Sequence, residues 1–81
     1  MSAIDNLLEV ARVFRQAQGL KTETVSWRVF GDSKKLALLM GGADLGTRRH
    51  AAAMLWFATN WPEGVAWPDG IDRPAGAEAA E

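Results

Sequence analysis

The chain has 81 residues, a formal net charge of −1 and no cysteine. Its length fits one domain, and its 48% hydrophobic residues, with four Trp and three Phe, indicate a packed core and not a disordered chain. With no Cys and His50 as the only histidine, disulfides and thiolate sites are excluded, and we expect no metal, no cofactor and no enzyme activity. No apolar run approaches the roughly 18 residues of a membrane span, so we expect a cytoplasmic protein without membrane contact.

The charges are unevenly distributed along the chain. Eight of the nine basic residues lie within residues 11–50, where only three acidic residues occur. The two ends of the sequence are acidic. This asymmetry suggests an acidic partner for the middle of the chain, although solvated helix faces would explain it equally well.

A first helix is expected over residues 2–18, with Ser2 or Asp5 as its cap. Gly19 stands where helices commonly end in a left-handed residue, and Leu20 can fold back onto the last turn. Apolar side chains recur at spacings of three and four, as in an amphipathic helix. They are Ile4, Leu7, Leu8, Ala11, Phe14 and Ala17.

Two shorter helices are expected next. In the second, over about 22–30, Val25 and Val29 share one face and should lie in the core. The pattern breaks at Gly31, after which Asp32 or Ser33 can cap a third helix over the run SKKLALLM. The expected inward side chains of this third helix are Leu36, Leu39 and Met40.

The last helix is expected over TRRHAAAMLWFATN, with Asp44 or Thr47 as its cap and Pro62 after its end. A Trp-Pro-acid-Gly unit then occurs twice, at 61–64 and 67–70, and its tryptophans should pin an irregular segment against the helices. The expected buried stripe of the last helix consists of Ala51, Met54, Leu55, Ala58 and Trp61.

These patterns predict an all-α fold. Since no convincing strand alternation occurs, we expect a compact four-helix domain over residues 1–74 with an irregular Trp-Pro-rich C-terminal segment. Residues 75–81, with the sequence AGAEAAE, are expected to form a flexible tail.

The run VARVFRQAQGLKTETVSWRVF, residues 10–30, resembles the helix-turn-helix of bacterial and phage repressors. The turn and second helix are similar to those of lac-type repressors at Gly19, Leu20, Thr24, Val25 and Ser26. The resemblance implies a DNA-binding domain with a recognition helix at about 22–30 in the major groove. One such motif offers limited contact area, which implies a homodimer on paired half-sites.

The DNA-binding residues that we predict lie on this helix and at the starts of the next two. Arg28 could bond guanine, Thr24 and Ser26 could contact bases or phosphates, and Lys21 could hold the backbone. Solvated charges, and capping or turn bonds for the hydroxyls, are the alternatives. The full set is Lys21, Thr22, Thr24, Ser26, Trp27, Arg28, Lys34, Lys35, Arg48 and Arg49.

The starts of the third and fourth helices carry the basic pairs Lys34-Lys35 and Arg48-Arg49. These charges oppose the helix dipoles, so local stability does not explain them. Phosphate binding would explain them. Trp27 has three alternatives: packing on another element, meeting a protein partner, or touching DNA.

The leading hypothesis is a small DNA-binding transcriptional regulator of phage or mobile-element type. A second hypothesis is an adaptor or antiactivator with a degenerate helix-turn-helix that binds another regulator or RNA polymerase. Trp27, and Arg15 at a position where the repressor pattern has a small residue, favour this second reading. A third, a phage structural or packaging accessory, has no positive feature in the sequence.

Overall fold

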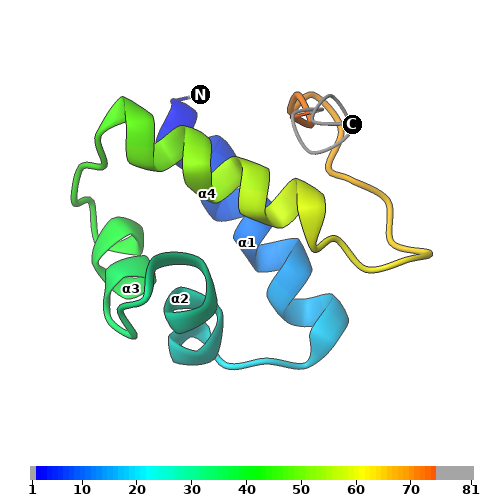
Figure 1. The fold of residues 1–81 in the computed structure, drawn as a ribbon, viewed down its shortest axis with the longest axis horizontal. Coiled ribbons are helices and arrows are strands. Elements are labelled where there is room, and N and C mark those ends of the chain that lie inside the picture. The colour runs from blue at the N-terminus through cyan, green and yellow to red at the C-terminus, as the bar shows by residue number, and fades with distance from the viewer. Residues whose placement is uncertain (1, 75–81) are drawn as a thin grey trace.

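In the computed structural model, which describes residues 2–74, the chain folds into four α-helices (Figure 1). Their bounds are α1 Ala3–Gln18, α2 Thr22–Phe30, α3 Lys35–Met40 and α4 Thr47–Thr59. The described residues contain no strand, so the predicted all-α class is confirmed. The predicted flexible tail, residues 75–81, lies outside the described residues.

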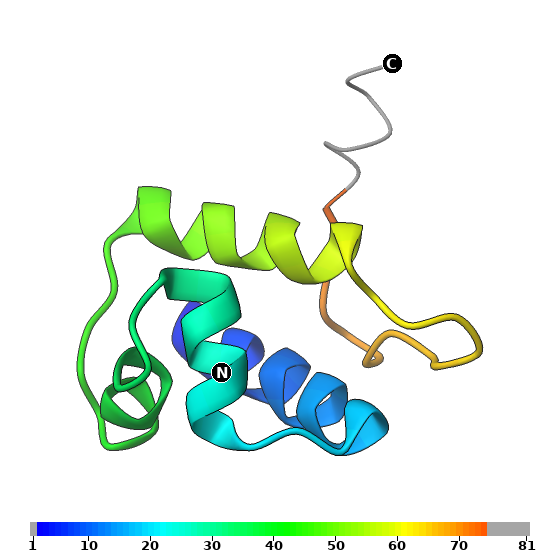
Figure 2. The same cartoon turned by 60° about the horizontal axis from the view of Figure 1, so that its bottom comes forward.

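The helices pack in two layers. Figure 2 shows α4 lying across the other three helices, while α2 packs most closely on α3 and α1 packs on α4. None of the helices within residues 2–74 combines the length and the apolar character needed to cross a membrane.

Both ends of α1 form as the sequence predicts. The Ser2 hydroxyl accepts a hydrogen bond from the Asp5 amide (3.1 Å), and the Asp5 carboxylate accepts one from the Ser2 amide (3.2 Å). At the other end, Gly19 has a φ of 65° and the Leu20 amide donates to the Arg15 carbonyl over 3.0 Å. The left-handed glycine therefore ends α1 and turns the chain into α2.

The predicted caps of α3 and α4 are wrong. The N-cap of α3 is Lys34 and that of α4 is Gly46, and neither of these two residues forms a side-chain cap bond. Asp32 instead holds the turn before α3, since its Oδ1 accepts from the Lys34 amide over 2.8 Å. The buried hydroxyl of Ser26 in α2 accepts a hydrogen bond from the Leu36 amide at the start of α3.

The core lies between the four helices. For α3 and α4, some of the residues expected to face it are exposed instead. Met40 is 61% exposed, because it is the last residue of α3 and lies at the open edge of a groove. Ala51 is exposed and Leu55 is 37% exposed, because α4 turns Phe57 toward the core. The buried apolar residues are Leu7, Val10, Ala11, Phe14, Val25, Leu36, Leu39, Ala53, Met54, Phe57 and Ala58.

The Trp-Pro segment after α4 is held against the helices, as predicted. The indole of Trp61 lies 6.0 Å from the ring of Phe14 and 4.8 Å from that of Trp67, measured between centroids. Arg73 secures the end of the segment, because its guanidinium donates to the Ala58 carbonyl (2.8 Å) and lies 5.4 Å from the Trp67 ring centroid. The segment thereby extends the aromatic core beyond the last helix.

Candidate functional site

The helix α2 has a buried side and an exposed side. Val25 is fully buried, and Val29 is half-buried against the core, so the predicted valine face is confirmed. On the opposite side Glu23 and Trp27 are exposed, and Arg28 is exposed on the flank of the helix. This exposed side offers an aromatic ring and charges of both signs to a partner.

Ser26 does not belong to that exposed side. Its side chain is fully buried, and its hydroxyl donates to the Asp32 carbonyl and accepts from the Leu36 amide (2.9 Å). A side chain that is buried and has both hydrogen-bonding roles filled has no surface to offer to DNA. The predicted contact of Ser26 with DNA is therefore wrong, and the residue joins α2 to α3 instead.

The two threonines of α2 are half-buried. Thr22, its first residue, lines the wall of a groove, and Thr24 lies between the buried and exposed sides. Lys21 immediately precedes α2 as its N-cap residue and is exposed. The N-terminal end of α2 thus carries one exposed cation and two partly accessible hydroxyls.

Trp27 is 62% exposed, which removes packing into the core from the three alternatives. An exposed indole on a nine-residue helix is unusual, because burial of an aromatic side chain is a large source of stability in a small domain. Contact with a protein or with DNA are the alternatives that stay open.

Further cations lie at the starts of the next two helices. Lys34, Arg48 and Arg49 are exposed, and Lys35 is half-buried. Residues 41–46 connect the end of α3 to the start of α4 at one end of the molecule (Figure 1). The predicted phosphate-contacting residues are thus accessible on elements that flank α2.

These cations have no acidic partners within residues 2–74. The ion pair between Glu9 and Arg12 is the only one among those residues, although Glu23, Asp32 and Asp44 occur in the same part of the chain. Unpaired cations at helix starts gain nothing from the dipole and are left to solvent or to an anionic ligand.

His50 has a structural role. Its Nε2 donates a hydrogen bond to the Ala3 carbonyl over 2.8 Å, which ties the start of α4 to the start of α1. Among residues 2–74, no cluster of three His, Asp or Glu side chains is arranged to hold a metal ion.

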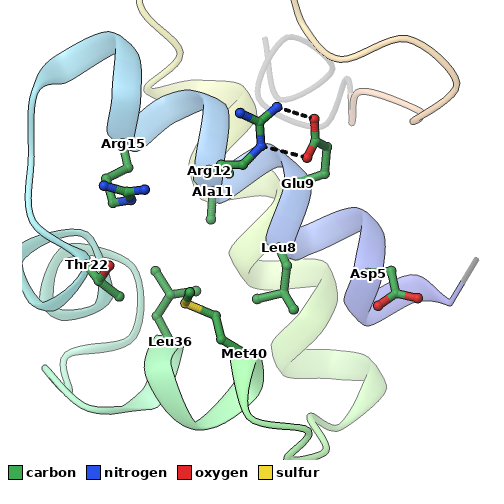
Figure 3. Close-up of a pocket in the computed structure, with 9 residues that line it drawn as sticks. All are labelled: Asp5, Leu8, Glu9, Ala11, Arg12, Arg15, Thr22, Leu36 and Met40. Atoms are coloured by element: carbon green, nitrogen blue, oxygen red, sulfur yellow. Dashed lines mark hydrogen bonds and ion pairs between the residues drawn. The ribbon is translucent and has the colours of Figure 1, made fainter.

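Sequence reasoning did not find a groove that α1 and α3 form with the start of α2 (Figure 3). Its walls combine apolar side chains with four charged residues of α1. Residues far apart in sequence make these walls, so no local pattern could have shown it. The lining residues are Asp5, Leu8, Glu9, Ala11, Arg12, Arg15, Thr22, Leu36 and Met40.

Comparisons of the chain with protein-family models, with curated proteins and with solved structures found no match.

Proposed function

We propose that this protein is a small DNA-binding regulator that presents α2 to the major groove and its flanking cations to phosphates. It is supported by the resemblance to a repressor helix-turn-helix, which covers α1, the turn at residues 19–21 and α2. It uses Arg28 and Thr24 near base edges. The phosphate contacts are assigned to Lys21, Lys34, Lys35, Arg48 and Arg49.

The observation that carries the proposal is the set of cations without acidic partners around α2. Six side chains, four of them at the starts of α3 and α4, have neither an ion pair nor a side-chain hydrogen bond within residues 2–74. The four at the starts of α3 and α4 oppose the helix dipoles, so helix stability does not account for them and they are left to solvent or to an anionic ligand. Phosphates are such a ligand, and each neutralised phosphate releases counterions on binding.

A titration with a labelled random-sequence duplex over a series of salt concentrations tests the proposal. We expect binding at low salt whose logarithm falls linearly with the logarithm of salt concentration. Lys34→Gln should lower the magnitude of this slope by about 0.9, the value for one phosphate contact. Arg28→Ala should instead reduce discrimination between DNA sequences. On a site selected for tight binding, loss of this base contact should cost about 1–3 kcal/mol of binding free energy.

Arg12→Gln is the matched control for Lys34→Gln. It removes one positive charge from α1, where Arg12 is already paired with Glu9, and should leave the salt slope unchanged. Absence of binding at low salt, or equal slopes for the wild type and Lys34→Gln, would contradict DNA binding.

The exposure of Trp27 favours a second candidate function, an adaptor that binds another regulator or RNA polymerase. An exposed aromatic residue is a typical anchor of a protein interface. Direct binding to purified RNA polymerase, abolished by Trp27→Ala in a chain that binds no duplex, would decide for this second candidate.

A further inference from the structure

The groove between α1 and α3 has the size and the wall chemistry of a small-molecule site. Its volume is about 470 Å³, within the range of ligand pockets. Leu8 and Ala11 of α1 face Leu36 and Met40 of α3 across it, and Thr22 closes one end (Figure 3). A ligand in this groove would therefore be mostly in contact with apolar side chains.

Three of the four charged lining residues already have partners. Arg12 donates to Glu9 from Nε (2.9 Å) and Nη2 (2.7 Å), and from Nη1 to the side chain of Gln16 (3.1 Å). The hydrogen bond from Arg12 lowers the pKa of Glu9 below its usual range, so this carboxylate stays ionised and paired. Asp5 belongs to the capping box with Ser2.

Arg15 is the fourth, and within residues 2–74 its guanidinium has no ion pair and no side-chain hydrogen bond. The residue is half-buried. Figure 3 shows its side chain extending from α1 toward Thr22 and α3, at the opposite end of the groove from Asp5. A guanidinium with five donors, partly shielded from water beside an apolar wall, is well suited to bind a carboxylate through two parallel hydrogen bonds.

We propose that this groove binds a small apolar monocarboxylate. The carboxylate pairs with Arg15, and the hydrocarbon part lies along Leu8, Leu36 and Met40. A single negative charge fits best, because Asp5 and Glu9 in the same walls repel a more highly charged anion. This proposal is independent of DNA binding.

Octanoate, used below its micelle concentration, is the probe, and 1-octanol is its uncharged counterpart. In amide NMR titrations of the full chain, octanoate should cause saturable shifts at the lining residues and bind at least tenfold more tightly than 1-octanol. Arg15→Gln should weaken octanoate binding at least tenfold and change 1-octanol binding less than twofold. Arg12→Gln removes the same charge from the paired neighbour and should change octanoate binding less than Arg15→Gln does.

A second variant tests the apolar wall. Met40 is exposed, so Met40→Glu should leave the helical circular dichroism unchanged while it places a negative charge at the groove and abolishes octanoate binding. Equal affinity for octanoate and 1-octanol, no effect of Arg15→Gln, or shifts away from the groove would overturn the proposal. A dimer in sedimentation that Arg15→Gln dissociates would also overturn it and assign the groove to a second copy of the chain.

Discussion

At the scale of single residues, Ser26 shows how a polar side chain can serve the core. It is the only buried polar residue among the described residues, and its hydroxyl connects the Asp32 carbonyl to the Leu36 amide. Leu36 is itself buried at the first turn of α3, where the helix cannot supply a partner for this amide. The hydroxyl therefore replaces the cap that α3 lacks.

Ser26→Ala should lower the free energy of unfolding by about 1–3 kcal/mol, because it leaves the buried Leu36 amide without an acceptor. Urea denaturation of the two proteins measures the difference. Ser33→Ala, in the exposed turn before α3, is the control and should change stability by less than about 0.5 kcal/mol. Equal stability of the two variants would show that Ser26 does not join α2 to α3.

Ser26 also marks a limit of sequence reasoning. Its side chain is on the helix position next to Val25, and a serine beside a predicted recognition surface is most simply assigned to that surface. Its hydroxyl instead accepts a hydrogen bond from the Leu36 amide, ten residues further along the chain, and this pairing depends on how α2 and α3 pack. The valine face of the same helix turns Trp27 away from the core, but the sequence does not show whether another element covers the indole, so its exposure could not be predicted.

At the scale of helices, glycines determined most of the boundaries that the sequence predicted. Gly19 and Gly31 end α1 and α2 with φ values of 65° and 70°, a conformation that few other residues adopt. Starts of helices were predicted less well, because Asp32, Asp44 and Thr47 are all common cap residues and only the backbone decides among them. The groove that Arg15 lines could not be predicted at all, since three helices build it.

The start of α4 can be improved by one substitution. Gly46 is its N-cap residue, and any residue can adopt its backbone angles (φ −63°, ψ 152°). A Cβ added at this position would have no other atom within 4 Å. Gly46→Ser should supply the missing side-chain cap and raise the free energy of unfolding by about 0.5 kcal/mol. Thermal unfolding followed by circular dichroism measures this gain without any change of net charge.

Gly42→Ser provides the comparison for that substitution. Gly42 also has free space around it, but its φ of 106° is strained for a residue with a side chain. The same substitution should therefore destabilise the protein there. A gain at both positions, or at neither, would mean that backbone conformation and capping do not control this end of α4.

At the scale of the whole molecule, the Trp-Pro segment enlarges a core that four short helices cannot complete. A chain of this length buries a smaller share of its surface on folding than a larger domain does, so each aromatic contact matters. The two repeated units fold in the same way: the indole of Trp61 donates to the Val65 carbonyl (2.7 Å), and that of Trp67 donates to the Ile71 carbonyl (2.8 Å). The pinning role of these tryptophans was predictable from sequence, but the indole bond four residues ahead was not.

Trp67→Phe tests whether this hydrogen bond holds the segment. The phenyl ring keeps most of the apolar contact with Trp61 but has no donor for the Ile71 carbonyl, so we expect a loss of about 1 kcal/mol in unfolding free energy. The segment should also open more often, and a glutamate-specific protease should cleave several-fold faster after Glu63. Trp56→Phe is the control, since the Trp56 indole contacts the rings of Phe14 and Phe57 and donates no hydrogen bond within residues 2–74. Cleavage at the same rate in Trp67→Phe and the wild type would show that the hydrogen bond of Trp67 does not hold the segment.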